Sequence, residues 1–421
     1  MLTSGVASIT YRGLTLVSKF LLVIYLGRHA SISTLGAYAL MTSMIQLSMY
    51  IVGLDFYIYS TRELATNGQN QIGKIIKNQF IVHGLIYFAT LPAMIFVVTQ
   101  LIGWSYIPWF IALLIVEHAS QEGSRILIAL SKPTQAIFSQ FLRSGLWVYA
   151  SIATIIAIPT TSIDTLTIIW IGWLLGAIVS ILYIAYTIGL PSLKELVSSH
   201  IDKKWIKKGI RMSTPFALSS LGFFGISHFA RFILENHSGE TAVGIYSFFF
   251  NFSSIIDAFI MAGIINVLLP KIIKAGRSEA ATNLTPILTK MTKLIFCTCI
   301  VLVITLSLGI NVILSYVGKT ELIENINIFY ILLAAAVILC MSHVPHYYLF
   351  ATHKDNQIIA SHIITLVFTT AGYLICIPAF GLQGAAYCYL LGTFLLLALK
   401  SIPAYKSLKP HLPILNLPSI K

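Results

Sequence analysis

Charged side chains interrupt several long apolar segments of this 421-residue chain. An ionisable group in the middle of a bilayer costs about 2.5–3.5 kcal/mol on insertion scales, so such residues are rare and usually functional. The cations in these segments are Arg12, Lys19, Arg125, Arg143 and Arg231, and the acids are Asp55, Glu117, Glu122 and Asp257.

Arg12 and Lys19 are two helical turns apart and therefore share one face of the first apolar segment. A face with two cations must line a water-filled cavity or meet acids on a neighbouring helix. With Arg143 and Arg231, these residues could form a cationic path from one side of the membrane to the other. Arginine and lysine are the usual partners of phosphate groups. We therefore predict that Arg12, Lys19, Arg143 and Arg231 bind a substrate that carries phosphate.

The alternative interpretation is that acids neutralise these cations inside the protein. Glu117 lies near the middle of its segment, where it could carry a coupling proton or pair with Lys19 or Arg143. The other possible pairs are Arg12 or Arg143 with Asp55, Arg231 with Asp257, and Arg125 with Glu122.

The composition indicates that membrane helices must position these residues. The chain is 57% hydrophobic and only 10% charged, whereas soluble domains carry about 25% charged residues. Its apolar runs are long and continuous, as spanning helices require. We therefore predict an all-α integral membrane protein with about 12 spans, near residues 5–27, 35–60, 78–100, 107–128, 135–158, 165–189, 209–234, 241–266, 286–308, 326–350, 358–379 and 384–400.

The loops between these segments predict the orientation. Lys and Arg gather in one alternate set of loops, and the opposite set holds only Arg28 and Lys319. The positive-inside rule then places both termini in the cytoplasm. The net charge of +13 is thus mainly a topology signal with some attraction to anionic lipids, and we expect no nucleic-acid partner.

Two motifs recur about half a chain apart. The segment 35–38 (LGAY) is echoed by 243–246 (VGIY), and 129–135 (ALSKPTQ) by 351–357 (ATHKDNQ). The members of each pair fall on the same side of the membrane in the predicted topology, which indicates parallel repeats and a transporter architecture. The predicted organisation is an N-terminal six-helix lobe (1–190), an amphipathic cytoplasmic connector (191–208), a C-terminal six-helix lobe (209–400) and a cytoplasmic tail (401–421).

With these segments placed, the chain resembles a known family. The stretches 24–27 (IYLG) with 35–38, Pro215 leading to 231–234 (RFIL) and 243–247 (VGIYS), and 381–386 (GLQGAA) are similar to polysaccharide-biosynthesis flippases of the multidrug/oligosaccharidyl-lipid/polysaccharide (MOP) exporter superfamily. The similarity is greatest to the O-antigen repeat-unit (Wzx-type) flippases. The family often has an acid before the arginine of the seventh span, where this chain has Ala230, and His228 could replace it in part.

The resemblance implies a V-shaped bundle with alternating access. The cargo would be an undecaprenyl-diphosphate-linked oligosaccharide, flipped from the cytoplasmic to the outer leaflet of a bacterial inner membrane, with cavity cations holding the diphosphate. A polysaccharide polymerase and chain-length machinery would be possible partners. Alternatives are a multidrug exporter of the same superfamily and a flippase for teichoic or capsular precursors. We expect no enzyme activity, metal or cofactor, since none of the motifs GxxxxGK[ST], HExxH or GxSxG occurs in the chain.

Overall fold

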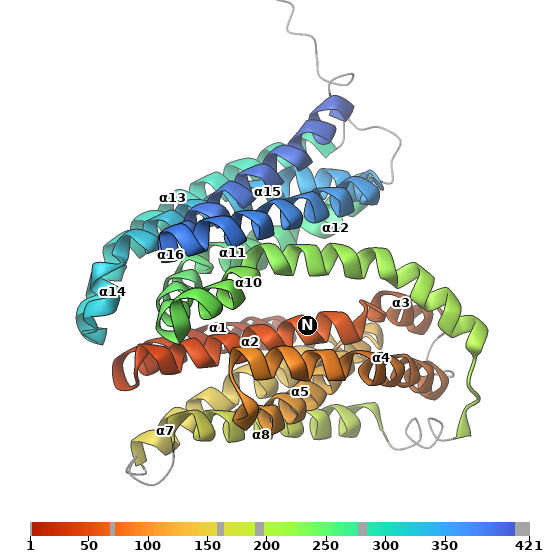
Figure 1. Ribbon diagram of the computed structural model, residues 1–421. Helices are drawn as coiled ribbons and strands as arrows, with labels where there is room; N and C mark the ends of the chain where they lie inside the picture. The colour runs from red at the N-terminus through yellow and green to blue at the C-terminus, as the bar shows by residue number, and fades with distance from the viewer. Residues whose placement is uncertain (1, 68–71, 158–163, 190–197, 277–283, 409–421) are drawn as a thin grey trace, which may run out of the picture. The chain divides into compact units, whose positions relative to one another are not determined.

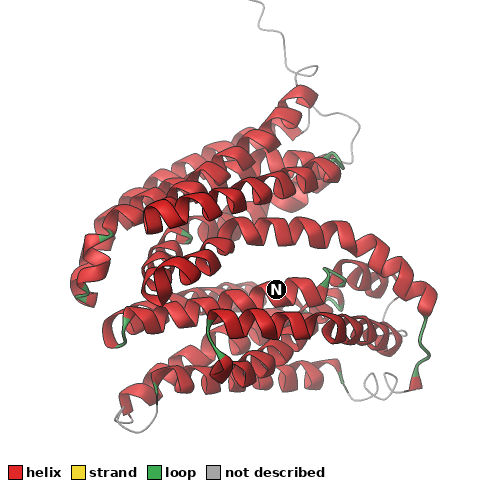
Figure 2. Ribbon diagram, in the orientation of Figure 1, coloured by secondary structure: helices red, strands yellow, loops and turns green. Residues whose placement is uncertain are grey.

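The computed structural model describes residues 2–67, 72–157, 164–189, 198–276 and 284–408. Within these ranges the chain is almost entirely helical and contains no strand (Figure 2). The first half contains α1 (Leu2–His29), α2 (Ile32–Gly53), α3 (Tyr57–Asn67), α4 (Ile72–Leu101), α5 (Ile107–Ala129), α6 (Pro133–Phe141), α7 (Trp147–Ala157) and α8 (Thr165–Ile188). The second half contains α10 (Lys203–Ser253), α11 (Ile255–Ile260), α12 (Asn266–Gly276), α13 (Leu284–Val317), α14 (Thr320–Glu324), α15 (Ile326–Ala351) and α16 (Asp355–Leu408), coloured green to blue in Figure 1.

Each predicted span overlaps one or more of these helices. Within the described residues, eight helical stretches are long and apolar enough to cross a membrane. Two of these stretches contain a glycine with positive φ, Gly239 in α10 and Gly381 in α16, at which two helices meet. Each of these glycines lies between two predicted spans. Glycine suits such a turn, because it adopts positive φ at little cost. The prediction of a helical, multi-pass membrane protein is thus confirmed, whereas the count of twelve and the orientation remain predictions.

The chain forms two compact units. The first comprises residues 1–224, 234–248 and 317–319, and the second comprises residues 225–233, 249–316 and 320–421. The described part of the predicted connector, residues 198–208, falls within the first unit, and the predicted lobe boundaries stay a prediction. Residues 191–197 of the connector and 409–421 of the predicted tail lie outside the described residues.

The predicted span 35–60 is in fact broken. Helix α2 ends at Gly53, and both Leu54 and Asp55 adopt positive φ, at 48° and 47°, before α3 begins. The N–H of Leu54 still bonds to the carbonyl of Tyr50 at 3.1 Å, and the fully buried Phe56 packs edge-on against Tyr59 and Trp205. This tertiary packing holds a conformation that non-glycine residues seldom adopt, and it sets the backbone direction at Asp55.

The predicted span 135–158 is also irregular. A π-helical turn, Leu142–Leu146, separates α6 from α7 and contains Arg143. One extra residue in a turn rotates the following side chains relative to a regular α-helix, and such turns often occur at functional sites.

The echoed turns adopt the same conformation. Ser131 and His353 occupy the same place in the two motifs and have φ of 59° and 55°. The next residue donates its N–H five positions back in both turns, Lys132 to Leu127 and Lys354 to Leu349, each at 2.9 Å. Matching helix-ending turns support the predicted internal repeat.

The other echoed motif brings two glycines into close backbone packing within the first unit. A Cβ on Gly36 would lie 2.0 Å from the carbonyl oxygen of Glu240, and one on Gly244 would lie 2.1 Å from that of Ile32. The relation is reciprocal, as expected when equivalent helix turns of two repeats pack on each other. The repeated glycine of the motif is therefore explained by the space it leaves.

The start of α10 is fixed to the first unit. Asp202 precedes α10 and accepts from the N–H of Trp205 at 3.0 Å and from Lys74 Nζ at 2.9 Å. These hydrogen bonds lower the pKa of the Asp202 carboxyl below its usual range. Asn78 accepts the N–H of Asp202 at 2.8 Å. Residues 203–208 of the predicted connector therefore continue into the predicted seventh span as one helix.

Candidate functional site

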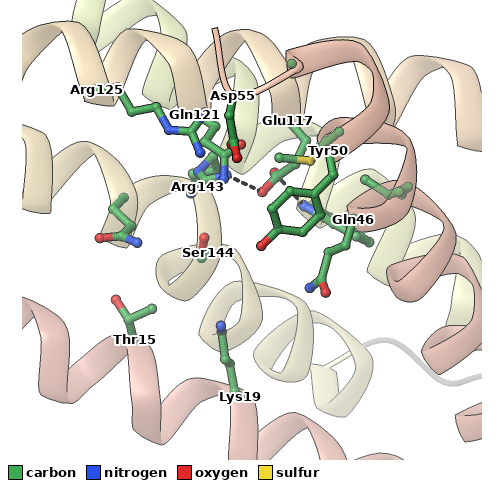
Figure 3. Close-up of a pocket in the computed structure, with 15 residues that line it drawn as sticks. Thr15, Lys19, Gln46, Tyr50, Asp55, Glu117, Gln121, Arg125, Arg143 and Ser144 are labelled. Carbon is green, nitrogen blue, oxygen red and sulfur yellow. Dashed lines mark hydrogen bonds and ion pairs between the residues drawn. The ribbon is translucent and has the colours of Figure 1, made fainter. Parts of the chain in front are cut away.

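A polar cavity of about 290 Å³ lies inside the first unit. It is bounded by α1, α2, α5, α8 and the π-helical turn, and Figure 3 shows Lys19 and Thr15 of α1 lying across from Arg143. A neighbouring cavity of about 350 Å³ shares Thr15, Lys19 and Gln140 with it and is also lined by Arg12. The residues that line the first cavity are Thr15, Lys19, Ile45, Gln46, Met49, Tyr50, Gly53, Asp55, Glu117, Gln121, Arg125, Gln140, Arg143, Ser144 and Trp173.

Arg143 and Glu117 form a buried ion pair in the wall of this cavity. Their side chains lie 2.6 Å apart, Nη1 to Oε1, and the residues are only 6% and 8% exposed. Trp173 donates its indole N–H to the other oxygen of Glu117 at 2.9 Å. Both oxygens of Glu117 are thus engaged. The sequence left Lys19 or Arg143 open as the partner of Glu117, and in the structure the partner is Arg143.

A second pair lies at the edge of the cavity, between Arg125 and Glu122. The two side chains meet three residues apart on α5, as the sequence predicts. Arg125 also lies over the ring of Tyr57, 3.6 Å from its centroid, and Gln79 donates to Glu122 at 2.6 Å. The charge of Arg125 is therefore offset locally.

Asp55 also faces the cavity, from the break after α2. The hydroxyl of Ser220 donates to its Oδ2 at 2.5 Å. The observed partner of Asp55 is thus a serine hydroxyl, whereas the sequence allowed an ion pair with Arg12 or Arg143. The contact also joins α10 to the wall of the cavity.

The remaining cations of these cavities, Arg12 and Lys19, differ in their surroundings. Both are exposed. Among the residues that the structure describes, no carboxylate lies within ion-pair distance of either side chain. The surplus positive charge of the two cavities therefore lies on one face of α1, as the seven-residue spacing predicts.

Two predicted site residues lie in the second unit and do not line these cavities. Arg231 is buried, contacts Nδ1 of His228 and lies 4.7 Å from the ring centroid of Phe250. Asp257 lies 2.7 Å from Nε2 of His343, whereas the sequence allowed a pair with Arg231. Of the four predicted cations, Arg12, Lys19 and Arg143 line the two cavities of the first unit, and the binding role of all four stays a prediction.

The sequence reasoning did not select the neutral polar residues of the cavity. Three glutamines line it, Gln46, Gln121 and Gln140, together with Ser144 and Tyr50. Glutamines inside predicted spans are themselves unusual, because an amide without a partner is costly in a bilayer. That rule, applied to uncharged residues, would have found them.

A sequence profile described as "Polysaccharide biosynthesis protein" matches residues 2–276. The chain belongs to the polysaccharide biosynthesis protein family. The match spans both cavities and Arg231. No curated protein matches the chain. The predicted family is confirmed at this level, and the O-antigen branch of it remains a prediction.

Solved structures with the same fold cover nearly the whole chain. An inward-facing multidrug resistance MATE family transporter of the MOP superfamily shares 14% identity over 96% of this chain and 98% of its own, with a TM-score of 0.77. An outward-facing MATE family transporter shares 15% identity over 96% and 94%, with a TM-score of 0.64. A MATE protein in a bent conformation shares 15% over 97% and 96%, with a TM-score of 0.63. The fold is therefore that of MOP-superfamily transporters.

Proposed function

We propose that this chain is a transporter that flips a lipid-linked oligosaccharide, carried on a polyprenyl diphosphate, across the bacterial inner membrane. The observation that carries the proposal is the electrostatic state of the cavities in the first unit. Glu117 is held by Arg143 and Trp173, and Asp55 by Ser220, while no carboxylate among the described residues lies within ion-pair distance of Lys19 or Arg12. Such a site favours an anion.

A diphosphate suits this arrangement. Lys19 and Arg12 lie two turns apart, about 10 Å along the axis of α1, so the two side chains can reach one diphosphate from adjoining cavities. Lysine acts as a point charge and arginine as a fork of donors, and both bind phosphate oxygens. Arg143 adds to the positive field, although Glu117 offsets much of its charge.

The neutral polar residues of the cavity would form hydrogen bonds with the sugar. Gln46, Gln121 and Gln140 offer both donors and acceptors, as sugar hydroxyls require. Each cavity is near the lower end of ligand-site volumes, about 300 Å³, which suits a polar head. The isoprenoid tail would then remain in the bilayer, and alternating access of the two units would move the head between leaflets. Two solved MATE family transporters are described in an inward-facing and an outward-facing conformation, the two states that alternating access requires.

The second candidate is a multidrug exporter, favoured by the fold of the solved relatives, two of which are named as multidrug resistance transporters. A cationic drug would need an available carboxylate. Glu117 is already paired with Arg143, which leaves Asp55, bonded to the neutral hydroxyl of Ser220. Lys19 and Arg12 outnumber this carboxylate in the lining of the two cavities, so the net charge favours the anionic cargo.

The test uses purified protein in liposomes that contain an undecaprenyl-diphosphate-linked oligosaccharide with a fluorescent sugar. Flipping is measured as the fraction of label accessible to a membrane-impermeant quencher. We expect the wild type to equilibrate the label between leaflets and Lys19→Gln to be much slower, with Lys319→Gln as a control of equal charge change. Transport of a cationic dye without flipping of the labelled lipid would refute the proposal.

A further inference from the structure

A second amphiphilic site lies at the start of α10, apart from the polar cavities. A groove of about 630 Å³ runs between α4 and α10 in the first unit. Its apolar wall consists of aliphatic side chains and its rim of three cations. The residues that line it are Ile81, Leu85, Ile201, Lys203, Ile206, Lys207, Ile210 and Arg211.

The spacing of the cations explains why they share one rim. Lys203, Lys207 and Arg211 follow one another at four-residue intervals, so they lie along one side of α10. Ile206 and Ile210 lie beside them on the same side. The three cations extend over about 12 Å of helix, and none of the described residues that line the groove is an acid.

The apolar part of the groove is open to its surroundings. Leu85 is 63% exposed, Ile201 55% and Ile210 37%. In a membrane protein, an exposed apolar surface beside a spanning helix faces the acyl chains of the lipids. The three cations on its rim are all exposed, as expected for long side chains that reach the headgroup region.

The groove is also held in place by the contacts that fix the start of α10. Trp205 points to the other side of the helix and packs against Phe56 and Tyr59, with ring centroids 5.4 and 4.9 Å away. Asp202 is bound by Lys74 and Asn78 of α4. Both walls of the groove are thus fixed to each other, so little ordering is required when a ligand binds.

We propose that this groove binds an anionic phospholipid of the leaflet at this end of the protein. The phosphate would lie among Lys203, Lys207 and Arg211, and an acyl chain would lie along Leu85, Ile201 and Ile210. The positive-inside rule predicts that this leaflet is the cytoplasmic one, and basic pockets beside spanning helices there are suited to anionic headgroups. Charge complementarity selects an anionic lipid over a zwitterionic one, and the proposal is independent of the cargo.

The experiment is lipid competition on the purified full-length protein, with bound lipids counted by native mass spectrometry. The delipidated protein receives equal amounts of phosphatidylglycerol and phosphatidylcholine in detergent. We expect the wild type to prefer phosphatidylglycerol by at least about five-fold, the factor that one favourable cation supplies. The combined variant Lys203→Gln, Lys207→Gln and Arg211→Gln should bind the two lipids nearly equally.

Two further variants keep the result interpretable. Lys204→Gln, Lys271→Gln and Lys274→Gln together remove the same charge from exposed positions outside the groove, and this variant should keep the preference. The variant with Lys203→Arg, Lys207→Arg and Arg211→Lys should keep it as well, which shows that a loss is not due to misfolding.

Three outcomes would overturn the proposal. An equal loss in the control variant would mean that net charge alone attracts the lipid. Displacement of the bound lipid by millimolar inorganic pyrophosphate would assign the cations to a soluble anion. Displacement by an equal amount of undecaprenyl diphosphate would assign the groove to the cargo.

Discussion

The buried pair of Arg143 and Glu117 gives the sharpest prediction for the wall of the cavity. Both residues are at least nine-tenths buried, and Trp173 supplies the other donor to Glu117. Removal of one partner of a buried pair typically costs about 3–5 kcal/mol, because the other charge stays buried without compensation. We therefore expect Arg143→Gln and Glu117→Gln each to lower the free energy of unfolding by about that amount.

The double variant should recover much of this loss. With both charges removed, two neutral amides remain that can bond to each other and to Trp173, so the coupling free energy should be at least about 2 kcal/mol. Thermal unfolding in detergent, followed by tryptophan fluorescence, measures the shift for each variant. Glu117→Gln combined with Arg125→Gln is the matched control, and its effects should add, because Arg125 pairs with Glu122.

The reasoning would be refuted if the losses of the two single variants simply added in the double variant. That result would mean that the two charges do not compensate each other. Flipping by the double variant separates structure from transport. If Arg143 mainly offsets Glu117, a stable double variant should retain most of the activity.

Further predictions concern α1, the repeated motif and the start of α10. Lys19→Gln should lower the affinity for the diphosphate lipid by about ten-fold or more while unfolding stays unchanged, since the residue is exposed, and Lys19→Arg should retain binding; titration with the labelled lipid measures both. Gly36→Val and Gly244→Val should each reduce stability by more than about 2 kcal/mol, because the added atoms meet a carbonyl oxygen at 2.0–2.1 Å, and a normal melting temperature in both would contradict the packing. Asp202→Ala should lower stability by about 1 kcal/mol at neutral pH through loss of the helix cap. The folded-state pKa of Asp202 is depressed, so its contribution is complete above about pH 4 and fades as the pH falls through the folded value; the melting temperatures of wild type and variant should converge in acid.

Hydropathy and charge were sufficient for the broad fold. The apolar segments overlap the helices, and the turns at Ser131 and His353 match as the repeated motif predicts. The break at Leu54 was not predicted, because no Gly–Pro or polar cluster marks it and the conformation depends on the distant packing of Phe56 with Trp205. The π-helical turn at Arg143 has no local sequence pattern for the same reason.

The charged residues of the candidate site were predictable from the sequence, but most of their partners were not. The sequence identified Arg143 and Glu117 as unusual in a membrane and left their partners open. The partner depends on the rotation of each helix and on the extra residue of the π-helical turn, which are set by tertiary packing. The Glu122–Arg125 pair was predictable, because both residues lie on one helix at a spacing that brings them together.

The most direct measurement of the central claim is to delete the gene in the bacterium and locate the lipid-linked oligosaccharide. We predict build-up of the diphosphate-linked precursor on the cytoplasmic leaflet and loss of surface polysaccharide. Both defects should be restored by the wild-type gene and not by Lys19→Gln expressed at the same level. Normal surface polysaccharide together with increased sensitivity to cationic drugs would contradict the account and favour a multidrug exporter.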